Sequence, residues 1–172
     1  MSADYASLIR DIPDFPVPGV LFRDITPLLG DAEAYRAAIQ DMAAPFRDSG
    51  IDQVVAVEAR GYLLGAPLAV ELGAGFVPVR KIGKLPSETY TAEYALEYGE
   101  ATIEMHRDGL LGHHRVLLVD DVIATGGTMA ATVDVVEQAG ATVAGIAVLV
   151  ELTALGGRTA IAGHDLFALI SL

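Results

Sequence analysis

The chain has no cysteine among its 172 residues. Without cysteine there is no disulfide framework and no zinc site built on thiolates. The sequence also has no window of 18 uncharged apolar residues, so we expect no membrane-spanning segment and no membrane partner. Residues 1–10 include Asp4 and lack the apolar core of a secretory signal, so we expect a cytoplasmic protein.

Basic residues are scarce. The 11 Lys and Arg stand against 23 Asp and Glu, which gives a formal net charge of −12. Because a protein that binds a phosphate backbone needs a basic face, a nucleic-acid partner is not expected. The motif G-x-x-x-x-G-K-[ST] is absent as well, which excludes a P-loop ATPase. Any place where the few basic residues cluster is therefore informative.

Apolar residues make up 52% of the chain, so a packed core rather than a disordered chain is expected. Short apolar runs alternate with helical patterns, which predicts an α/β fold with a mostly parallel central sheet flanked by helices. We expect strands at residues 53–57, 75–79, 116–119, 143–150 and 166–170. We expect helices over residues 3–12, after Asp31, around residues 64–72 and from about Met129. No linker or repeat interrupts residues 1–172, which predicts a single domain.

One stretch organises the chain: residues 116–128, which read VLLVDDVIATGGT. Its apolar start predicts a buried strand, and Asp120 and Asp121 follow where burial is expected to stop. A turn of small residues then opens a helix, and the unpaired N–H groups and dipole at a helix start favour an anion. This turn consists of Ala124, Thr125, Gly126, Gly127 and Thr128. Such a turn suits a phosphate, and paired carboxylates suit the paired hydroxyls of a sugar.

This stretch resembles the signature of the type I phosphoribosyltransferases, which bind 5-phosphoribosyl-1-pyrophosphate. The resemblance implies that Asp120 and Asp121 bind the ribose hydroxyls and that residues 124–128 bind the 5′-phosphate. The alternative is an ordinary strand–turn–helix junction whose aspartates are only solvated.

Four polar loops are expected at one edge of the sheet, because ligands bind such sheets beyond the carboxyl ends of the strands. The loops are Glu58–Gly61, Arg80–Lys84, Asp120–Thr128 and Glu151–Thr153. Two of them contain four basic residues, which predicts an anion pocket in this acidic protein. The family resemblance implies a pyrophosphate site made of Ala59, Arg60, Arg80, Lys81 and Lys84. It also implies that Arg60 and Lys84 stabilise charge on the leaving group.

The resemblance to the branch of the family that acts on adenine runs over nearly the whole chain. It is carried by FPxPG at 15–19, FRDI at 22–25, ARG at 59–61, RKxGKLP at 80–86, LEYG at 96–99 and VELT at 150–153. It implies an N-terminal hood, about residues 1–35, that covers the base. Polar and aromatic residues before an alternating segment predict a flexible antiparallel flap, about residues 82–106, with 101–105 as an edge strand.

The same resemblance implies the residues around the base. Leu21, Phe22, Arg23 and Leu152 match positions that bind adenine. Glu97 matches the catalytic flap carboxylate that reaches the adenine ring, and Tyr98 is expected near the reacting centre.

The resemblance implies a purine salvage enzyme that transfers the 5-phosphoribosyl group from phosphoribosyl pyrophosphate to adenine and yields AMP and pyrophosphate. It implies Mg²⁺ as a cofactor that the substrate carries, with no direct protein ligand. It also implies a homodimer. Two alternatives stay open, because spacing alone does not choose the base. One is a phosphoribosyltransferase for another purine, and the other is a non-catalytic regulator of the same fold that senses the same ligand.

Overall fold

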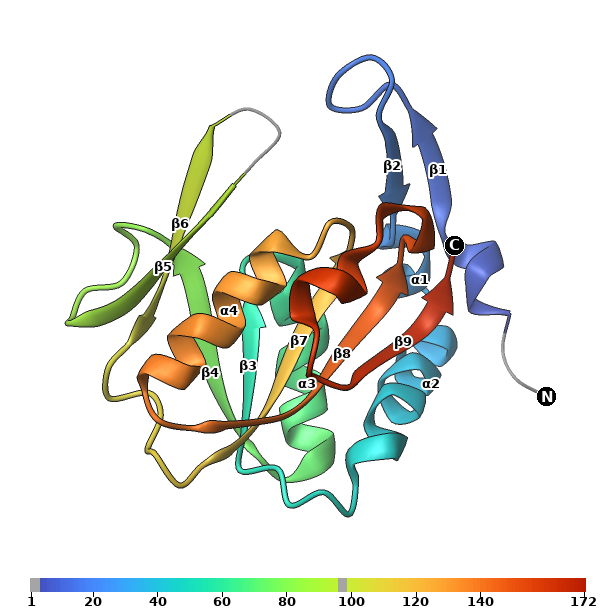
Figure 1. Cartoon of the computed structure of the whole chain (residues 1–172). Coiled ribbons are helices and arrows are strands. Elements are labelled where there is room, and N and C mark those ends of the chain that lie inside the picture. The colour runs from blue at the N-terminus through green and yellow to red at the C-terminus, as the bar shows by residue number, and fades with distance from the viewer. Residues whose placement is uncertain (1–3, 96–98) are drawn as a thin grey trace.

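Within residues 4–95 and 99–172, which the computed structural model describes, a seven-stranded sheet forms the centre of the molecule (Figure 1). The strand order is β5-β6-β4-β3-β7-β8-β9, and β4, β3, β7, β8 and β9 run parallel. The strands are β3 (Gln53–Val57), β4 (Gly75–Lys81), β5 (Thr89–Ala95), β6 (Glu100–His106), β7 (Arg115–Ile123), β8 (Thr142–Glu151) and β9 (Leu166–Ser171).

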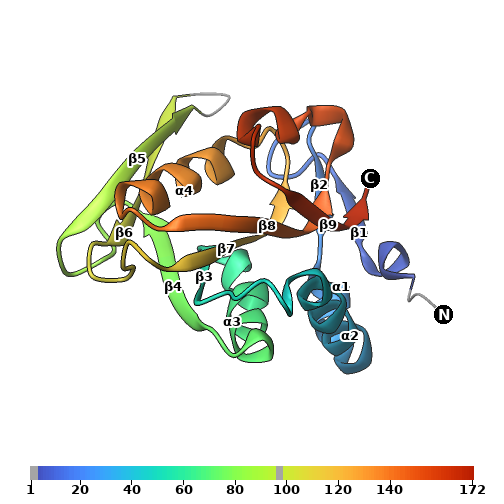
Figure 2. The same cartoon turned by 60° about the horizontal axis from the view of Figure 1, so that its bottom comes forward.

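Helices cover both faces of the sheet, as Figure 2 shows. The α-helices are α1 (Thr26–Gly30), α2 (Ala32–Ala43), α3 (Arg60–Leu72) and α4 (Gly127–Gln138). Short 3-10 helices are η1 (Tyr5–Leu8), η2 (Ala44–Phe46), η3 (Thr153–Leu155) and η4 (Gly157–Ile161). Helix α4 lies on one face, and α1, α2 and α3 lie on the other. In the described part of the chain, no helix is long and apolar enough to cross a membrane.

The core consists of two apolar layers, one on each face of the sheet. Side chains alternate along β7, so Leu118 packs with Val136 of α4, whereas Leu117 packs with Leu68 of α3 in the other layer. Because both faces are covered, the central strands are continuous apolar runs rather than alternating ones. The predicted α/β fold with a mostly parallel sheet is therefore confirmed.

The predicted helix after Asp31 is also confirmed, and the helix that follows it in the chain accommodates a proline. Asp31 caps α2, because its Oδ1 accepts the amides of Glu33 and Ala34 at 3.0 Å each. Pro67 lies inside α3 and cannot donate to the carbonyl four residues before it, that of Leu63. The hydroxyl of Tyr35 donates to the Leu63 carbonyl instead, which explains how α3 accommodates its proline.

The N-terminal prediction was wrong beyond residue 8. A helix was expected over residues 3–12, but η1 ends at Leu8 and strand β1 (Arg10–Pro13) follows. Strand β1 pairs antiparallel with β2 (Leu21–Asp24) and forms a two-stranded arm beside the main sheet. Pro13 accounts for the difference, because the residue before a proline is driven towards extended conformations.

Strand β7 is longer than predicted. The acids were expected where burial stops, yet β7 continues to Ile123 and pairs with β8 through Val122 and Val150. Asp121 is only 4% exposed. The long neighbour β8 supplies backbone partners past the acids, a contact that local sequence does not reveal.

The flap contains the predicted antiparallel pair, β5 with β6. The prediction that residues 101–105 form an edge strand was wrong, because β6 lies between β5 and β4. Ile103, Glu104 and Met105 are buried there. The edge position belongs to β5 instead.

Strand order reverses between β3 and β7. Helix α3 leads the chain from β3 to β4 on one side, and α4 leads it from β7 to β8 on the other (Figure 1). A reversal of this kind opens a crevice beyond the carboxyl ends of the two strands. The loops that follow β3 and β7 are therefore the place to look for a site.

Candidate active site

The turn at residues 124–128 joins β7 to α4 and lines a cavity of about 100 Å³. Gly126 is the N-cap residue of α4 and has a φ of 86°. A Cβ at this position would lie 2.5 Å from the carbonyl oxygen of Gly157 and 2.8 Å from Ala160 Cβ. Both its conformation and its contact with η4 therefore require glycine, and this close packing sets the shape of the turn.

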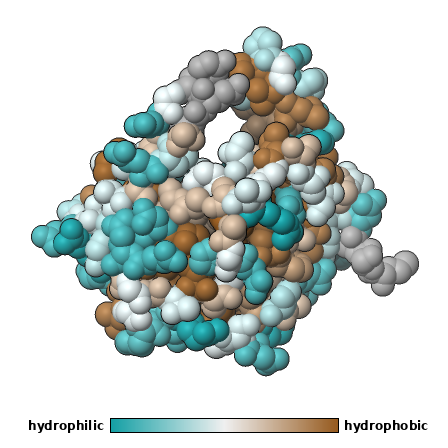
Figure 3. Space-filling model, viewed as in Figure 1, coloured by the Kyte–Doolittle hydropathy of each residue, from teal (hydrophilic) through white to brown (hydrophobic). Residues whose placement is uncertain are grey.

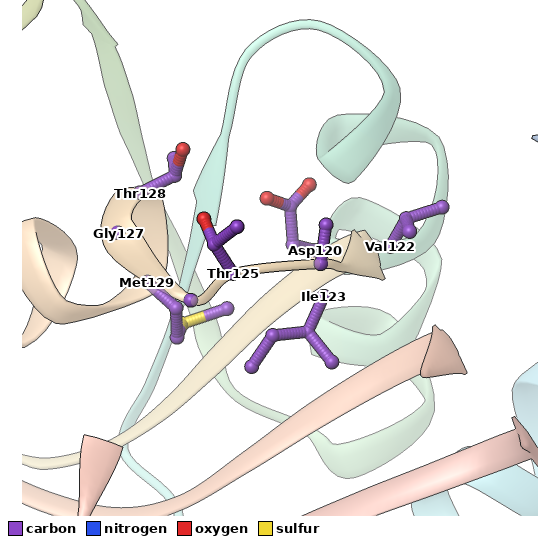
Figure 4. A pocket seen from close by; sticks show the side chains of 9 residues that line it. Asp120, Val122, Ile123, Thr125, Gly127, Thr128 and Met129 are labelled. Atoms are coloured by element: carbon purple, nitrogen blue, oxygen red, sulfur yellow. The ribbon is translucent and has the colours of Figure 1, made fainter. Parts of the chain in front are cut away.

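Figure 4 shows which side of the turn is open. The hydroxyls of Thr125 and Thr128 and the carboxylate of Asp120 point to the same side. Ile123 and Met129 point away from it, and both are buried in the core. The turn thus presents hydroxyl donors and the start of a helix to the cavity, which is an arrangement suited to a phosphate.

The two acids of β7 have different environments. Asp121 is buried, and its Oδ2 lies 2.8 Å from Nε of Arg60 in an ion pair without hydrogen-bond geometry. Asp120 lines the cavity, and its Oδ1 accepts the Asp121 amide at 2.8 Å. Burial, followed by the charge of Asp121, raises the pKa of Asp120 well above its ordinary value. A ligand that donates hydrogen bonds to this carboxylate would stabilise its ionised form.

A second cavity, of about 210 Å³, adjoins the first and shares Asp120 and Thr128 with it. The loop after β3 contributes Glu58, Ala59 and Arg60, and β4 contributes Lys81. Strand β5 of the flap adds Tyr94. Three of the four predicted loops therefore meet here. The fourth does not line either cavity: Glu151 pairs with Arg158 of η4 through two contacts of 2.7 Å.

Arg80 and Lys84 do not line the cavity, but both contact Glu58, which does. Its Oε2 accepts from Arg80 at 3.2 Å and from Lys84 Nζ at 3.1 Å, and its Oε1 accepts the Lys81 amide at 2.6 Å. Sequence reasoning assigned no role to Glu58. The available signal was an acid directly beside the basic loop, at the end of a buried strand.

Glu104 is a second functional residue that the sequence analysis missed. It lies on β6, is 3% exposed, and its Oε1 accepts the amides of Lys84 and Leu85 at 2.8 Å each. The carboxylate therefore fixes the backbone that carries Lys84. Its role was hidden because residues 101–105 were expected to have one face in water.

The β1–β2 arm brings one predicted base-binding residue, Phe22, into contact with Arg60, which lines the second cavity. The Arg60 guanidinium lies over the Phe22 ring, 5.0 Å from its centroid, and Phe15 packs edge-on against Phe22 at 5.1 Å. Arg23 is bound to Asp11 of β1, and Leu21 is 45% exposed. Figure 3 shows the apolar side chains of the arm, in brown at the top, beside a hollow in the surface.

One further predicted base-binding residue, Leu152, lies away from both cavities. Its amide donates to the Ile123 carbonyl at 3.0 Å. Glu97 and Tyr98 fall outside the described residues.

The fold and this site together define an α/β protein with two polar cavities at the point where its strand order reverses, which is where such folds place their ligands. A family model described as "Phosphoribosyl transferase domain" matches residues 29–165. The adenine phosphoribosyltransferase of Thermobifida fusca is 56% identical over 173 residues, which cover 98% of each chain. The crystal structure of that of Thermoanaerobacter pseudethanolicus has a TM-score of 0.96 at 49% identity, and 98% of each chain is covered. The chain therefore belongs to the phosphoribosyltransferase family, among the adenine phosphoribosyltransferases.

A solved relative from Saccharomyces cerevisiae bears on the ligands. It is an adenine phosphoribosyltransferase complexed with adenine and an imino-altritol bisphosphate. It has a TM-score of 0.91 at 36% identity, and 96% of each chain is covered.

Proposed function

We propose that the protein transfers the 5-phosphoribosyl group from phosphoribosyl pyrophosphate to adenine and releases AMP and pyrophosphate. One observation carries the proposal: a cavity lined by the turn at residues 124–128 adjoins a second cavity whose lining includes Arg60 and Lys81, and Asp120 faces both. A ribose on Asp120 would thus have its 5′-phosphate on one side and its pyrophosphate on the other. The adenine named for the relatives supports the choice of base.

Each part of the donor has a proposed set of partners. The 5′-phosphate binds Ala124, Thr125, Gly126, Gly127 and Thr128. The ribose hydroxyls donate to Asp120 and Asp121. The pyrophosphate binds Ala59, Arg60, Arg80, Lys81 and Lys84. Adenine binds in the hood beside Leu21, Phe22, Arg23 and Leu152. These partners all belong to one proposed domain, residues 1–172, in which the hood is about residues 1–35 and the flap about residues 82–106.

The proposed reaction is a displacement at the anomeric carbon. A ring nitrogen of adenine forms the new bond to that carbon as the bond to the pyrophosphate oxygen breaks, and the configuration inverts. The transition state resembles an oxocarbenium ion, as in glycoside hydrolysis. Catalysis then comes from holding both reactants in place and from stabilising the leaving group by Arg60 and Lys84. Glu97 accepts the ring proton or fixes the orientation of the base.

The side chains at the site fit a magnesium ion that arrives with the substrate. Among the described residues, no group of three or more His, Asp or Glu is placed to cage a metal. Oδ2 of Asp121 is buried and has an ion pair with Arg60 but no hydrogen bond, and Asp120 faces the cavity. Magnesium favours one or two carboxylates together with substrate phosphates and waters. Asp120 and Asp121 would help to keep the substrate-borne ion at this cavity without being its direct ligands, and the ion would neutralise charge on the leaving group.

The decisive experiment measures AMP formed from adenine and phosphoribosyl pyrophosphate with and without added magnesium. We expect product only when all three are present. Guanine, hypoxanthine and two further bases assayed in parallel test the base preference. Faster transfer to another base would contradict the choice of adenine. Binding of the donor with no transfer to any base would point to the non-catalytic regulator.

A homodimer in the cytoplasm is the proposed working form. Leu63 and Val70 are 46% and 83% exposed and lie seven residues apart on α3, so they share one side of the helix. Apolar residues on one exposed side of a helix suit a self-complementary two-fold contact. The absence of cysteine is compatible with a reducing compartment.

A further inference from the structure

Glu58 is a negative charge in the floor of the cavity proposed for pyrophosphate. Its side chain is only 9% exposed and holds Arg80 and Lys84 at 3.2 and 3.1 Å. These two partners do not line the cavity, but they are 36% and 46% exposed beside Glu58, which leaves part of each open to a ligand that extends beyond the cavity. Nε of Arg80 is buried and has no partner among the described residues, which leaves a donor of this guanidinium unsatisfied.

The Glu58 carboxylate is ionised in this setting. Burial by itself would raise its pKa, but hydrogen bonds from the Lys81 amide, Lys84 and Arg80, together with the charge of Lys84, outweigh burial and lower the pKa. A bound pyrophosphate therefore meets cations that already have an anionic partner. Every contact it makes with Arg80 or Lys84 is made in competition with Glu58 or beside its charge.

We propose that Glu58 competes with pyrophosphate for Arg80 and Lys84. Glu58 binds both cations in the empty enzyme and binds them again when the product leaves. The inference rests on the proposed function, because it assumes that pyrophosphate binds at this cavity. A site made of cations alone would bind a multiply charged product tightly and release it slowly. Glu58 lowers the affinity for pyrophosphate without blocking its site, so it favours product release. It also keeps the cation side chains in place between turnovers.

Replacement of Glu58 by glutamine separates this role from a structural one. Glu58→Gln keeps the shape of the side chain and an oxygen that can accept the Lys81 amide, but it removes the charge. Calorimetry with magnesium pyrophosphate should show affinity about tenfold higher than in the wild type, the order expected for one competing charge near a cation cluster. Turnover should fall, with a burst of AMP in the first cycle, because product release becomes slower.

Glu151→Gln is the matched control. Glu151 is also a buried carboxylate at the end of a parallel strand, and it also pairs with a half-exposed arginine, Arg158. It lines neither cavity, so its glutamine variant should bind pyrophosphate with wild-type affinity. Equal or weaker binding in Glu58→Gln would overturn the proposal and would mean that the carboxylate serves the ligand or only the fold.

A measurement on the wild-type protein covers the case in which Glu58→Gln does not fold. In a crystal soaked with magnesium pyrophosphate, at least one of Arg80 and Lys84 should turn from Glu58 to the ligand. Retention of both contacts with the ligand bound would overturn the proposal. Wild-type protein that neither makes AMP nor binds pyrophosphate would refute the proposed function itself, a result distinct from the other two.

Discussion

At the scale of single residues, the ionised carboxylate of Asp120 reduces the stability of the folded protein. The pKa of Asp120 is raised by burial and by the neighbouring Asp121, so the folded state binds that proton more tightly than the unfolded chain does. The associated stability is present below the ordinary aspartate pKa and is lost as the pH rises through the raised value. At neutral pH an ionised Asp120 therefore lowers the free energy of unfolding.

This cost predicts opposite effects on stability and on binding. Asp120→Asn should raise Tm by about 2–4 °C, equivalent to about 1 kcal/mol in a chain of this length. The same change should weaken binding of phosphoribosyl pyrophosphate, because an amide offers one acceptor oxygen where the carboxylate offers two. Thermal unfolding and calorimetry measure the two effects. Asp134→Asn, at an exposed position of α4, is the control and should change neither. A lower Tm in Asp120→Asn would contradict the argument.

Glu97 gives a second prediction at the residue scale. If it handles the ring proton of adenine, Glu97→Ala should lower kcat by about 10²–10⁴-fold and leave affinity for phosphoribosyl pyrophosphate nearly unchanged. Steady-state kinetics and calorimetry separate these quantities. Glu93→Ala serves as the control, because Glu93 is an exposed carboxylate on β5 of the same flap. A normal turnover number in Glu97→Ala would remove this residue from the chemistry.

At the scale of elements, the flap strand β6 and the loop after β4 behave as one unit because Glu104 joins them. Its carboxylate accepts two amides of the loop that carries Lys84. Glu104→Ala should therefore release the loop and raise KM for phosphoribosyl pyrophosphate roughly tenfold, the effect of losing about 1.4 kcal/mol of binding. Glu104→Gln keeps the accepting oxygen and should stay within about threefold of the wild type.

The control for this prediction lies on the same strand. Glu100 is exposed at the start of β6, so Glu100→Ala should leave KM unchanged. If Glu104→Gln raises KM as much as Glu104→Ala does, then the charge of Glu104 matters rather than its hydrogen bonds to the loop backbone.

The elements that were predicted correctly are those whose signals are local. The strand at 53–57, the Asp31 cap and the turn that opens α4 each depend on residues within a few positions of one another. The errors concern partners from distant parts of the chain. The position of β6 depends on its pairing with β4, and the length of β7 depends on β8. No periodicity within either segment contains that information.

The candidate site divides in the same way. The turn at 124–128 and the acids beside it are contiguous in sequence, and so they could be assigned to a sugar phosphate from the sequence. Glu58 and Glu104 act on Lys84 across 26 and 20 positions. A single carboxylate gives no sign of a partner so far away. Their roles became visible only when the strands placed them side by side.

At the scale of the whole molecule, the formal charge of −12 opposes a substrate that is itself strongly anionic. Four of the 11 basic residues lie at or just beyond the carboxyl ends of β3 and β4, namely Arg60, Arg80, Lys81 and Lys84. Because the Debye length at physiological ionic strength is about 8 Å, the distant acids of the surface are largely screened at the cavity, where the acids among the described residues that line it beside the cations are Glu58, Asp120 and Asp121. The acidic remainder of the surface favours solubility and disfavours nucleic acid.

Oligomeric state is the property of the whole molecule that can be tested most directly. A two-fold interface uses each residue twice, so Val70→Glu would place two carboxylates in the proposed contact along α3. Sedimentation of the wild type should give about twice the chain mass of 18.0 kDa, and Val70→Glu should sediment as a monomer. Leu111→Glu changes another exposed apolar residue, away from α3, and should remain dimeric. A monomeric wild type would refute the dimer, and a dimeric Val70→Glu would place the interface on another surface.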